Sequence, residues 1–210
     1  MSLKEIHEEL NRIYKGINDF YYDGKLPECV ITIQSNKVIK NDAYGWIITK
    51  GWIDKELEEY YELNIAAEYL DYDIYSIAAT MNHEMVHIYC LENDIHEVSK
   101  NRRYHNKVFK EKAEARGLKI DKAPSIGFSV TSTTPEFCEF IDSLNIKPVF
   151  DLRRVTFETE KKKKPRKQMP KYTCPSCGAV VRGKEGLRII CSDCDCEFKY
   201  VKSEDKEDEK

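Results

Sequence analysis

Two histidines and a glutamate within five residues give this sequence its clearest capacity for chemistry. They belong to the segment His83-Glu84-Met85-Val86-His87, which has the HExxH pattern. On a helix, residues four positions apart lie one turn above each other, so both imidazoles can reach one zinc ion. A zinc ion with three protein ligands keeps a position for water and lowers the pKa of that water to about 7. The pattern therefore predicts hydrolysis of a peptide bond by zinc-bound water, with Glu84 as general base and His83 and His87 as ligands.

This zinc needs a third ligand, and the downstream sequence offers four candidates: His96, His105, Glu111 and Glu114. We favour His105, because the polar stretch over residues 93–104 is long enough to return the chain over the metal before His105 opens a new helix. Glu111 is the alternative.

A second metal site is indicated near the C-terminus, where five of the eight cysteines lie between Cys174 and Cys196. Cys174 and Cys177 form one CxxC pair, and Cys191 and Cys194 form another, which is the spacing of a zinc ribbon. Four thiolates close a tetrahedral site, so we expect this zinc to be structural and to supply most of the folding free energy of so short a segment. Cys196 would break the two-residue spacing if it replaced Cys194, and we interpret it as a free thiol.

The HExxH segment must be carried by a helix, and the surrounding sequence has helical periodicity over residues 72–93. Ile74, Ile77, Met81 and Met85 form an apolar stripe on the side opposite the two histidines. We therefore expect the stripe to anchor the helix in the core and the histidines to face a cleft.

Further elements are predicted around this helix. Helices are expected over residues 3–20, 105–116 and 135–144, and short strands over 29–33, 43–49 and 62–67. Three strands of this length suggest one small sheet. The fold class is therefore α+β, with a three-stranded sheet and the HExxH helix in the first domain and a zinc ribbon in the second.

Charge and composition divide the chain and limit its partners. A basic run over residues 161–167 has no apolar side chain to bury and indicates an exposed linker. We divide the chain into a metallopeptidase domain (1–157), a basic linker (158–170), a zinc ribbon (171–202) and a disordered acidic tail (203–210). The basic linker and the cations of the ribbon favour phosphate contacts, so nucleic acid is a candidate partner there, although the net charge of -3 does not indicate one for the whole chain. The ribbon cations are Lys171, Arg182, Lys184 and Arg188.

No apolar run approaches the roughly 18 residues that cross a bilayer, and the N-terminus lacks the basic and then apolar stretch of a signal peptide. We expect no membrane partner and a cytoplasmic location. In a reducing compartment the clustered cysteines indicate metal binding rather than disulfides.

Three segments besides HExxH are similar to one known family. They are FYYDGKLP at 20–27, AYGW at 43–46 and HNKVF at 105–109. Together they resemble the SprT-like metallopeptidase family, which includes the Spartan proteases that cleave proteins crosslinked to DNA. The resemblance covers residues 6–118, and Asn106 stands where the family usually has glycine. It implies a zincin-like (minigluzincin) fold, His105 as third zinc ligand, and a protein substrate that is associated with DNA.

A different class of function is a non-catalytic zinc-binding adaptor that associates with nucleic acid through the ribbon. In that case the histidine site would serve stability alone. A purely structural site has no need of Glu84 and usually has four Cys or His ligands, so the sequence favours the peptidase.

Overall fold

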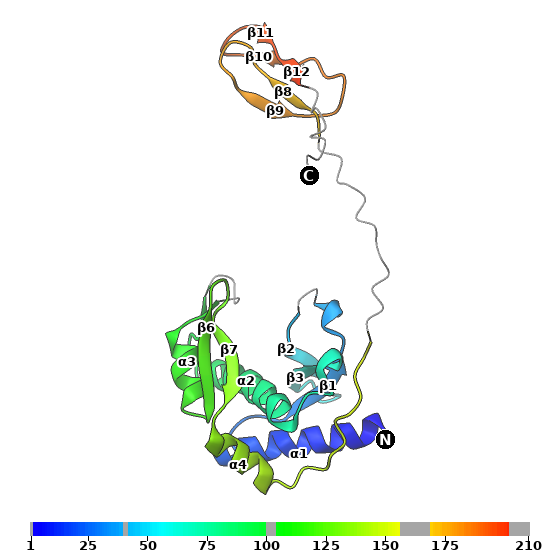
Figure 1. The fold of residues 1–210 in the computed structure, drawn as a ribbon, viewed down its shortest axis with the longest axis vertical. Helices are drawn as coiled ribbons and strands as arrows, with labels where there is room; N and C mark the ends of the chain where they lie inside the picture. Colours follow the sequence, from blue (N-terminus) through cyan, green and yellow to red (C-terminus); the bar gives the residue numbers. More distant parts are fainter. Residues whose placement is uncertain (1, 40–41, 100–103, 156–168, 202–210) are drawn as a thin grey trace, which may run out of the picture. The chain divides into compact units, whose positions relative to one another are not determined.

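The computed structural model describes residues 2–39, 42–99, 104–155 and 169–201. The chain divides into two compact units, Met1–Thr156 and Phe157–Lys210, and each is described by itself (Figure 1). The basic run over 161–167, most of the predicted linker, and the predicted tail over 203–210 lie outside the described residues.

The helix predicted over residues 3–20 is present as α1 (Leu3–Tyr21). It forms the base of the first unit in Figure 1. It begins at a capping box, in which the Ser2 side chain accepts from the Glu5 amide and the Glu5 carboxylate accepts from the Ser2 amide. One face of the helix is fully buried, and its core residues are Ile6, Leu10, Ile13 and Ile17. This apolar face supplies the surface on which the next layer packs.

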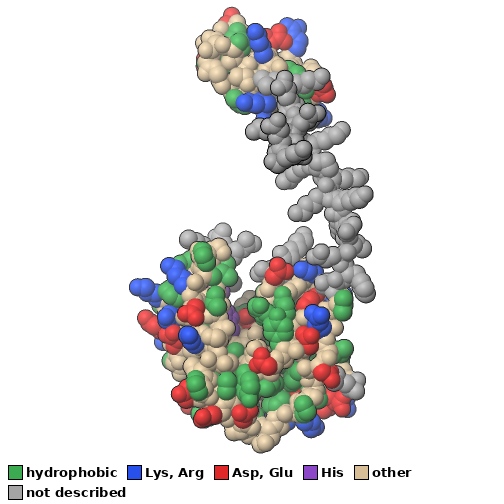
Figure 2. Space-filling model, viewed as in Figure 1, with side chains coloured by type: hydrophobic (Ala, Val, Ile, Leu, Met, Phe, Trp, Pro, Cys, Tyr) green, Lys and Arg blue, Asp and Glu red, His purple; other side chains and the backbone are tan. Residues whose placement is uncertain are grey.

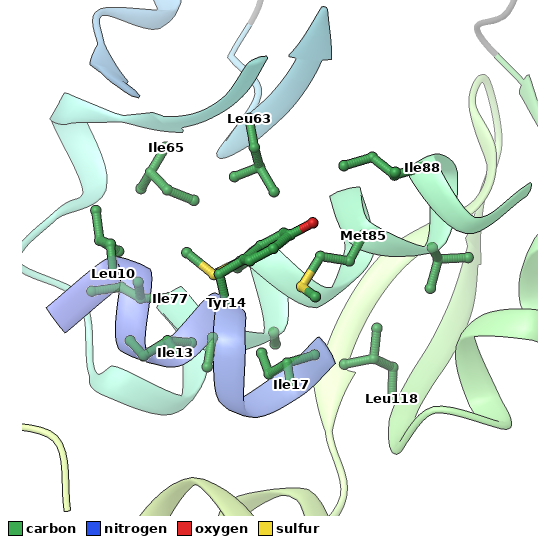
Figure 3. Packing of buried hydrophobic residues seen from close by; sticks show 14 of the residues in the cluster. Leu10, Ile13, Tyr14, Ile17, Leu63, Ile65, Ile77, Met85, Ile88 and Leu118 are labelled. Carbon is green, nitrogen blue, oxygen red and sulfur yellow. The ribbon is translucent and has the colours of Figure 1, made fainter. Parts of the chain in front are cut away.

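The predicted three-stranded sheet is present and consists of β1 (Cys29–Gln34), β2 (Gly45–Ile53) and β3 (Glu59–Ala66). The strand order is β1-β3-β2, with β1 parallel and β2 antiparallel to the central β3. Leu63 and Ile65 of β3 point toward α1 and the next helix, α2 (Figure 3). Because β3 lies in the centre, β2 is an edge strand of this sheet.

Helix α2 (Ile74–Glu92) carries the HExxH segment through the middle of the unit. It begins at Asp73, whose side chain accepts from the Ser76 amide. The predicted stripe is buried from Ile77 to Met85, but side chains on the other faces of the helix, including Val86 and Cys90, are buried as well. The reason is that α2 contacts the β1–β3 sheet on one side and β7 (Gly127–Thr133) and helix α3 (Lys107–Glu114) on another. The helix is therefore held on nearly all sides.

A second sheet was not predicted from the sequence. Its strands are β4 (Val98–Ser99), β5 (Tyr104–His105), β6 (Leu118–Ala123) and β7 (Gly127–Thr133), in the order β4-β5-β7-β6. The prediction that His105 opens a helix is wrong, since His105 lies in β5 and α3 spans Lys107–Glu114. The cause is Asn106, whose side-chain oxygen accepts from the amides of the two residues that follow Lys107 and so caps the helix. Helix α4 (Pro135–Ser143) follows the Thr134 cap as predicted.

The second unit is built from five short strands: β8 (Lys171–Thr173), β9 (Val180–Arg182), β10 (Ile190–Cys191), β11 (Cys196–Glu197) and β12 (Lys199–Val201). They form one sheet of order β12-β8-β9 and one β10-β11 pair. Its buried apolar cluster contains only Tyr172, Cys174, Cys191 and Phe198. A core of this size is too small to stabilise a domain without a further crosslink.

Among the described residues, no helix combines the length and the apolar character that crossing a membrane requires.

Candidate metal centres

Three histidine rings from two elements meet at one point in the first unit. His83 and His87 come from consecutive turns of α2, and His105 comes from β5. The Nε2 atom of His105 lies 3.3 Å from that of His83 and 3.0 Å from that of His87. Ligand nitrogens around a tetrahedral zinc ion, with bonds of about 2.0–2.1 Å, lie about 3.3 Å apart. The three Nε2 atoms therefore have the spacing of a metal site, and the group is one that could hold a metal ion.

The Nδ1 atom of each ring has a hydrogen-bond partner: a carboxylate, a backbone carbonyl or a hydroxyl. The Nδ1 atom of His87 lies 3.0 Å from Glu97 Oε1, and that of His105 lies 3.2 Å from the Ile126 carbonyl oxygen. The Nδ1 atom of His83 lies 2.7 Å from the Thr131 hydroxyl. A carboxylate and a carbonyl only accept, so the Nδ1 atoms of His87 and His105 carry the hydrogen and their Nε2 lone pairs face each other. Such converging lone pairs repel one another unless a cation lies between them, so the donor set fits a metal ion.

Burial keeps two of the rings, those of His83 and His105, in the neutral, metal-binding form. It lowers the pKa of His105 to about 4, with the nearby His87 adding to the effect. Burial also lowers the pKa of His83 well below its usual value, again reinforced by the other two histidines. At neutral pH both rings therefore offer an unprotonated nitrogen.

Phe109 packs against all three histidine rings. This residue of α3 is fully buried, and its ring centroid lies 4.6 Å from those of His83 and His105 and 4.7 Å from that of His87. Figure 2 shows histidine side chains at the floor of a hollow that opens between the region of β2 and the region of β6 and β7. The histidine rings thus pack against a buried phenylalanine and also border an open hollow.

Glu84 lies beside the histidines on α2 but outside the three-histidine group. Its carboxyl is almost fully buried, and this burial raises its pKa to about 7, while His87 acts in the opposite direction. A group with this pKa exchanges protons readily in both directions near neutral pH. A side chain at Gly45 of β2 would come within 3.3 Å of Glu84 Cγ and 2.9 Å of Thr80 Cγ2, so glycine lets the β2 backbone approach the carboxylate closely.

The remaining candidates for the third ligand lie elsewhere. His96, Glu111 and Glu114 are exposed, and none belongs to the metal-capable groups found among the described residues. Three residues around the histidines were not predicted from the sequence: Glu97 and Thr131, which contact the Nδ1 atoms, and Phe109, which packs against the rings. No periodicity or spacing marks Glu97 or Thr131, because each reaches its histidine through tertiary contacts.

The second metal centre lies in the ribbon, where the sulfurs of Cys174, Cys177, Cys191 and Cys194 all lie within 4.8 Å of one another. The Sγ atoms of Cys177 and Cys191 are 3.8 Å apart, close to the separation of about 3.8 Å that zinc–sulfur bonds of about 2.3 Å give in a tetrahedron. The Cys177 backbone amide donates to Cys174 Sγ at 3.5 Å and lowers the pKa of that thiol to about 6. The group could hold a metal ion as a closed set of four thiolates.

Comparisons with protein-family models, curated proteins and solved structures found no match for this chain.

The contact between His87 and Glu97 leads to a first prediction. Glu97 is buried, and the hydrogen bond from His87 holds its pKa below the usual value although burial alone would raise it. Replacing Glu97 with Gln keeps the shape but removes the negative charge behind the ligand, so we expect the Zn²⁺ affinity of the histidine centre to fall about tenfold. The affinity is measured by competition with a chromophoric chelator. Glu92→Gln serves as control, because it changes an exposed carboxylate on α2, the helix that carries His87. Equal affinities in the two variants would contradict the prediction.

Proposed function

We propose that this protein is a zinc-dependent metalloendopeptidase with a zincin-like, SprT-like first domain and a zinc ribbon. The observation that carries the proposal is the convergence of the Nε2 atoms of His83, His87 and His105, with the Glu84 carboxylate on the helix that carries His83 and His87. Among the described residues the histidine set offers three ligands, the number found in catalytic zinc sites, and the ribbon offers four, the number found in structural ones.

Zinc is the metal that best suits both donor sets, since it accepts imidazole and thiolate ligands in tetrahedral geometry. When bound at the histidines, it would act as a Lewis acid and lower the pKa of water to about 7. The resemblance to SprT-like metallopeptidases supports the same choice for His105 as third ligand.

The chain's own residues provide the proton transfers. Glu84 accepts a proton from the attacking water and afterwards donates it to the leaving amine. Its buried position keeps bulk water away from the carboxylate, and the Phe109 ring behind the histidines prevents them from rotating away. The positions of the reacting groups are thus set before substrate binds.

A polypeptide substrate is supported by the edge strand next to Glu84. Within the described part of the chain, β2 is hydrogen-bonded to β3 on one side only. Its first residue, Gly45, lies against the Glu84 side chain. An open strand edge offers backbone N–H and C=O groups to an extended peptide, and Ile48 and Trp52 of β2 are exposed nearby. We therefore propose that extended or unfolded protein segments are the substrates.

The charge of the ribbon bears on association with DNA. The described ribbon residues, 169–201, contain five basic and four acidic side chains, so their charges nearly balance. A contact with nucleic acid would thus depend on the basic run over 161–167, which lies outside the described residues.

Removal of the metal tests the proposed function. The purified full-length protein is incubated with a denatured protein substrate before and after treatment with a chelator. We expect cleavage to stop when zinc is removed and to return when zinc is added back. We also expect two zinc ions per chain, and one in the double variant His83→Ala/His87→Ala. Cleavage that continues in metal-free protein would exclude the proposal, and so would a zinc content that the double variant leaves unchanged.

A further inference from the structure

The ribbon contains a fifth cysteine that the four-sulfur group leaves out. Cys196 lies in β11 directly opposite Cys191 of β10. Its Sγ atom is 3.5 Å from Cys174 Sγ, which is shorter than the 3.8 Å between the paired sulfurs of Cys177 and Cys191. Unlike the buried Cys174, Cys196 is only partly buried. The Cys196 thiol thus lies in contact with Cys174, one of the four sulfurs that could hold the metal.

The chemistry of the two sulfurs differs once a metal is bound. Four thiolates complete the tetrahedral coordination of zinc, so Cys196 has no position to occupy on the ion. The ligand sulfurs share their lone pairs with the metal, whereas the partly buried Cys196 keeps its own. An oxidant would therefore react at the uncoordinated sulfur of Cys196, with Cys174, 3.5 Å away, as the resolving sulfur.

We propose that Cys196 is an oxidation site that forms a disulfide with Cys174 on reaction with a hydroperoxide and thereby releases the ribbon metal. In the first step the Cys196 sulfur attacks the peroxide, the O–O bond breaks, and a sulfenic acid and an alcohol (or water) are formed. In the second step the Cys174 sulfur attacks the sulfenic sulfur, the S–S bond forms and water leaves. Two thiols are oxidised by two electrons, and the peroxide is reduced by the same two.

Formation of this disulfide would remove one of the four metal ligands. A three-thiolate site binds zinc less tightly, and the apolar cluster of the ribbon has only four buried residues to hold the fold without it. The expected consequence is a ribbon that unfolds under oxidation while the first unit stays folded, because the first unit has a large core of its own. The inference depends on the ribbon metal site and is independent of peptidase activity.

The experiment compares zinc-loaded, full-length wild type with Cys196→Ser. Cys138→Ser, which removes a partly buried thiol of α4, is the matched control. Each protein is treated with hydrogen peroxide, released zinc is followed with a chromophoric chelator, and disulfides are located by fragmentation mass spectrometry after alkylation. Wild type and Cys138→Ser should release one zinc ion together with a Cys174–Cys196 crosslink. Cys196→Ser should release it at least about tenfold more slowly.

Three outcomes would overturn the inference. The first is equal rates of zinc release in wild type and Cys196→Ser, and the second is a crosslink between Cys174 and Cys177 as the main product. The third is a Cys196→Ser protein that lacks the ribbon zinc before oxidation, since this would make Cys196 a ligand in place of Cys194. None of these outcomes depends on cleavage of a substrate, so failure here is distinguishable from failure of the proposed function.

Discussion

Replacing Glu84 with Gln is expected to lower the rate of proteolysis by about 10²- to 10⁴-fold and to leave two zinc ions bound. The amide has the same shape as the carboxylate but cannot accept a proton from water. Because Glu84 lies outside the three-histidine group, its loss should not weaken metal binding. The measurement is the initial rate of cleavage of a denatured protein, together with the zinc content of the same sample.

Glu111→Gln is the matched control for this experiment. Glu111 is an exposed carboxylate on α3, and it was the alternative third ligand in the sequence analysis. We expect this variant to keep both its zinc and its activity. If Glu84→Gln cleaved as fast as Glu111→Gln with zinc bound, the protein would fit the non-catalytic adaptor better than the peptidase.

The parts of the site that the sequence predicted are those whose geometry is local. His83 and His87 lie one helical turn apart on α2, and this relation follows from helical spacing alone. The two CxxC pairs are local in the same sense, since each pair needs only one tight turn to bring its sulfurs together. For the same reason the amphipathic helices α1 and α4 were predicted nearly to their ends.

The missed parts depend on contacts between residues distant in sequence. His105 pairs with Val98 of β4 on one side and with Gly127 of β7 on the other, and its ring and backbone both bond to the Ile126 carbonyl, 21 positions away. Strands β4 and β5 are two residues long, so they are too short to show a period of two. The sequence indicated that His105 could be a ligand, but it led to the wrong element, a helix in place of β5.

Gly127 provides the second large expected effect, because it lies against the backbone that carries the third histidine. Its φ is +75°, and a methyl group there would meet the His105 carbonyl oxygen together with the Tyr104 ring at 2.9 Å. The carbonyl oxygen belongs to the β5 backbone and cannot retract without disturbing the pairing of β5 with β7. For Gly127→Ala we therefore expect His105 to move, the Zn²⁺ affinity of the histidine centre to fall by about 100-fold or more, and the free energy of unfolding to fall by about 2–4 kcal/mol.

Gly24→Ala separates the contact with His105 from the strain of a positive φ. Gly24 also has a positive φ, of +67°, but an added methyl group would meet only Asp19 Oδ1, at an ordinary distance of 3.6 Å. This variant should lose about 1 kcal/mol of stability and bind zinc as wild type does. Zinc affinity is compared by chelator competition and stability by denaturant unfolding. Equal zinc affinity in the two glycine variants would show that the pairing of β5 with β7 does not position His105 for metal binding.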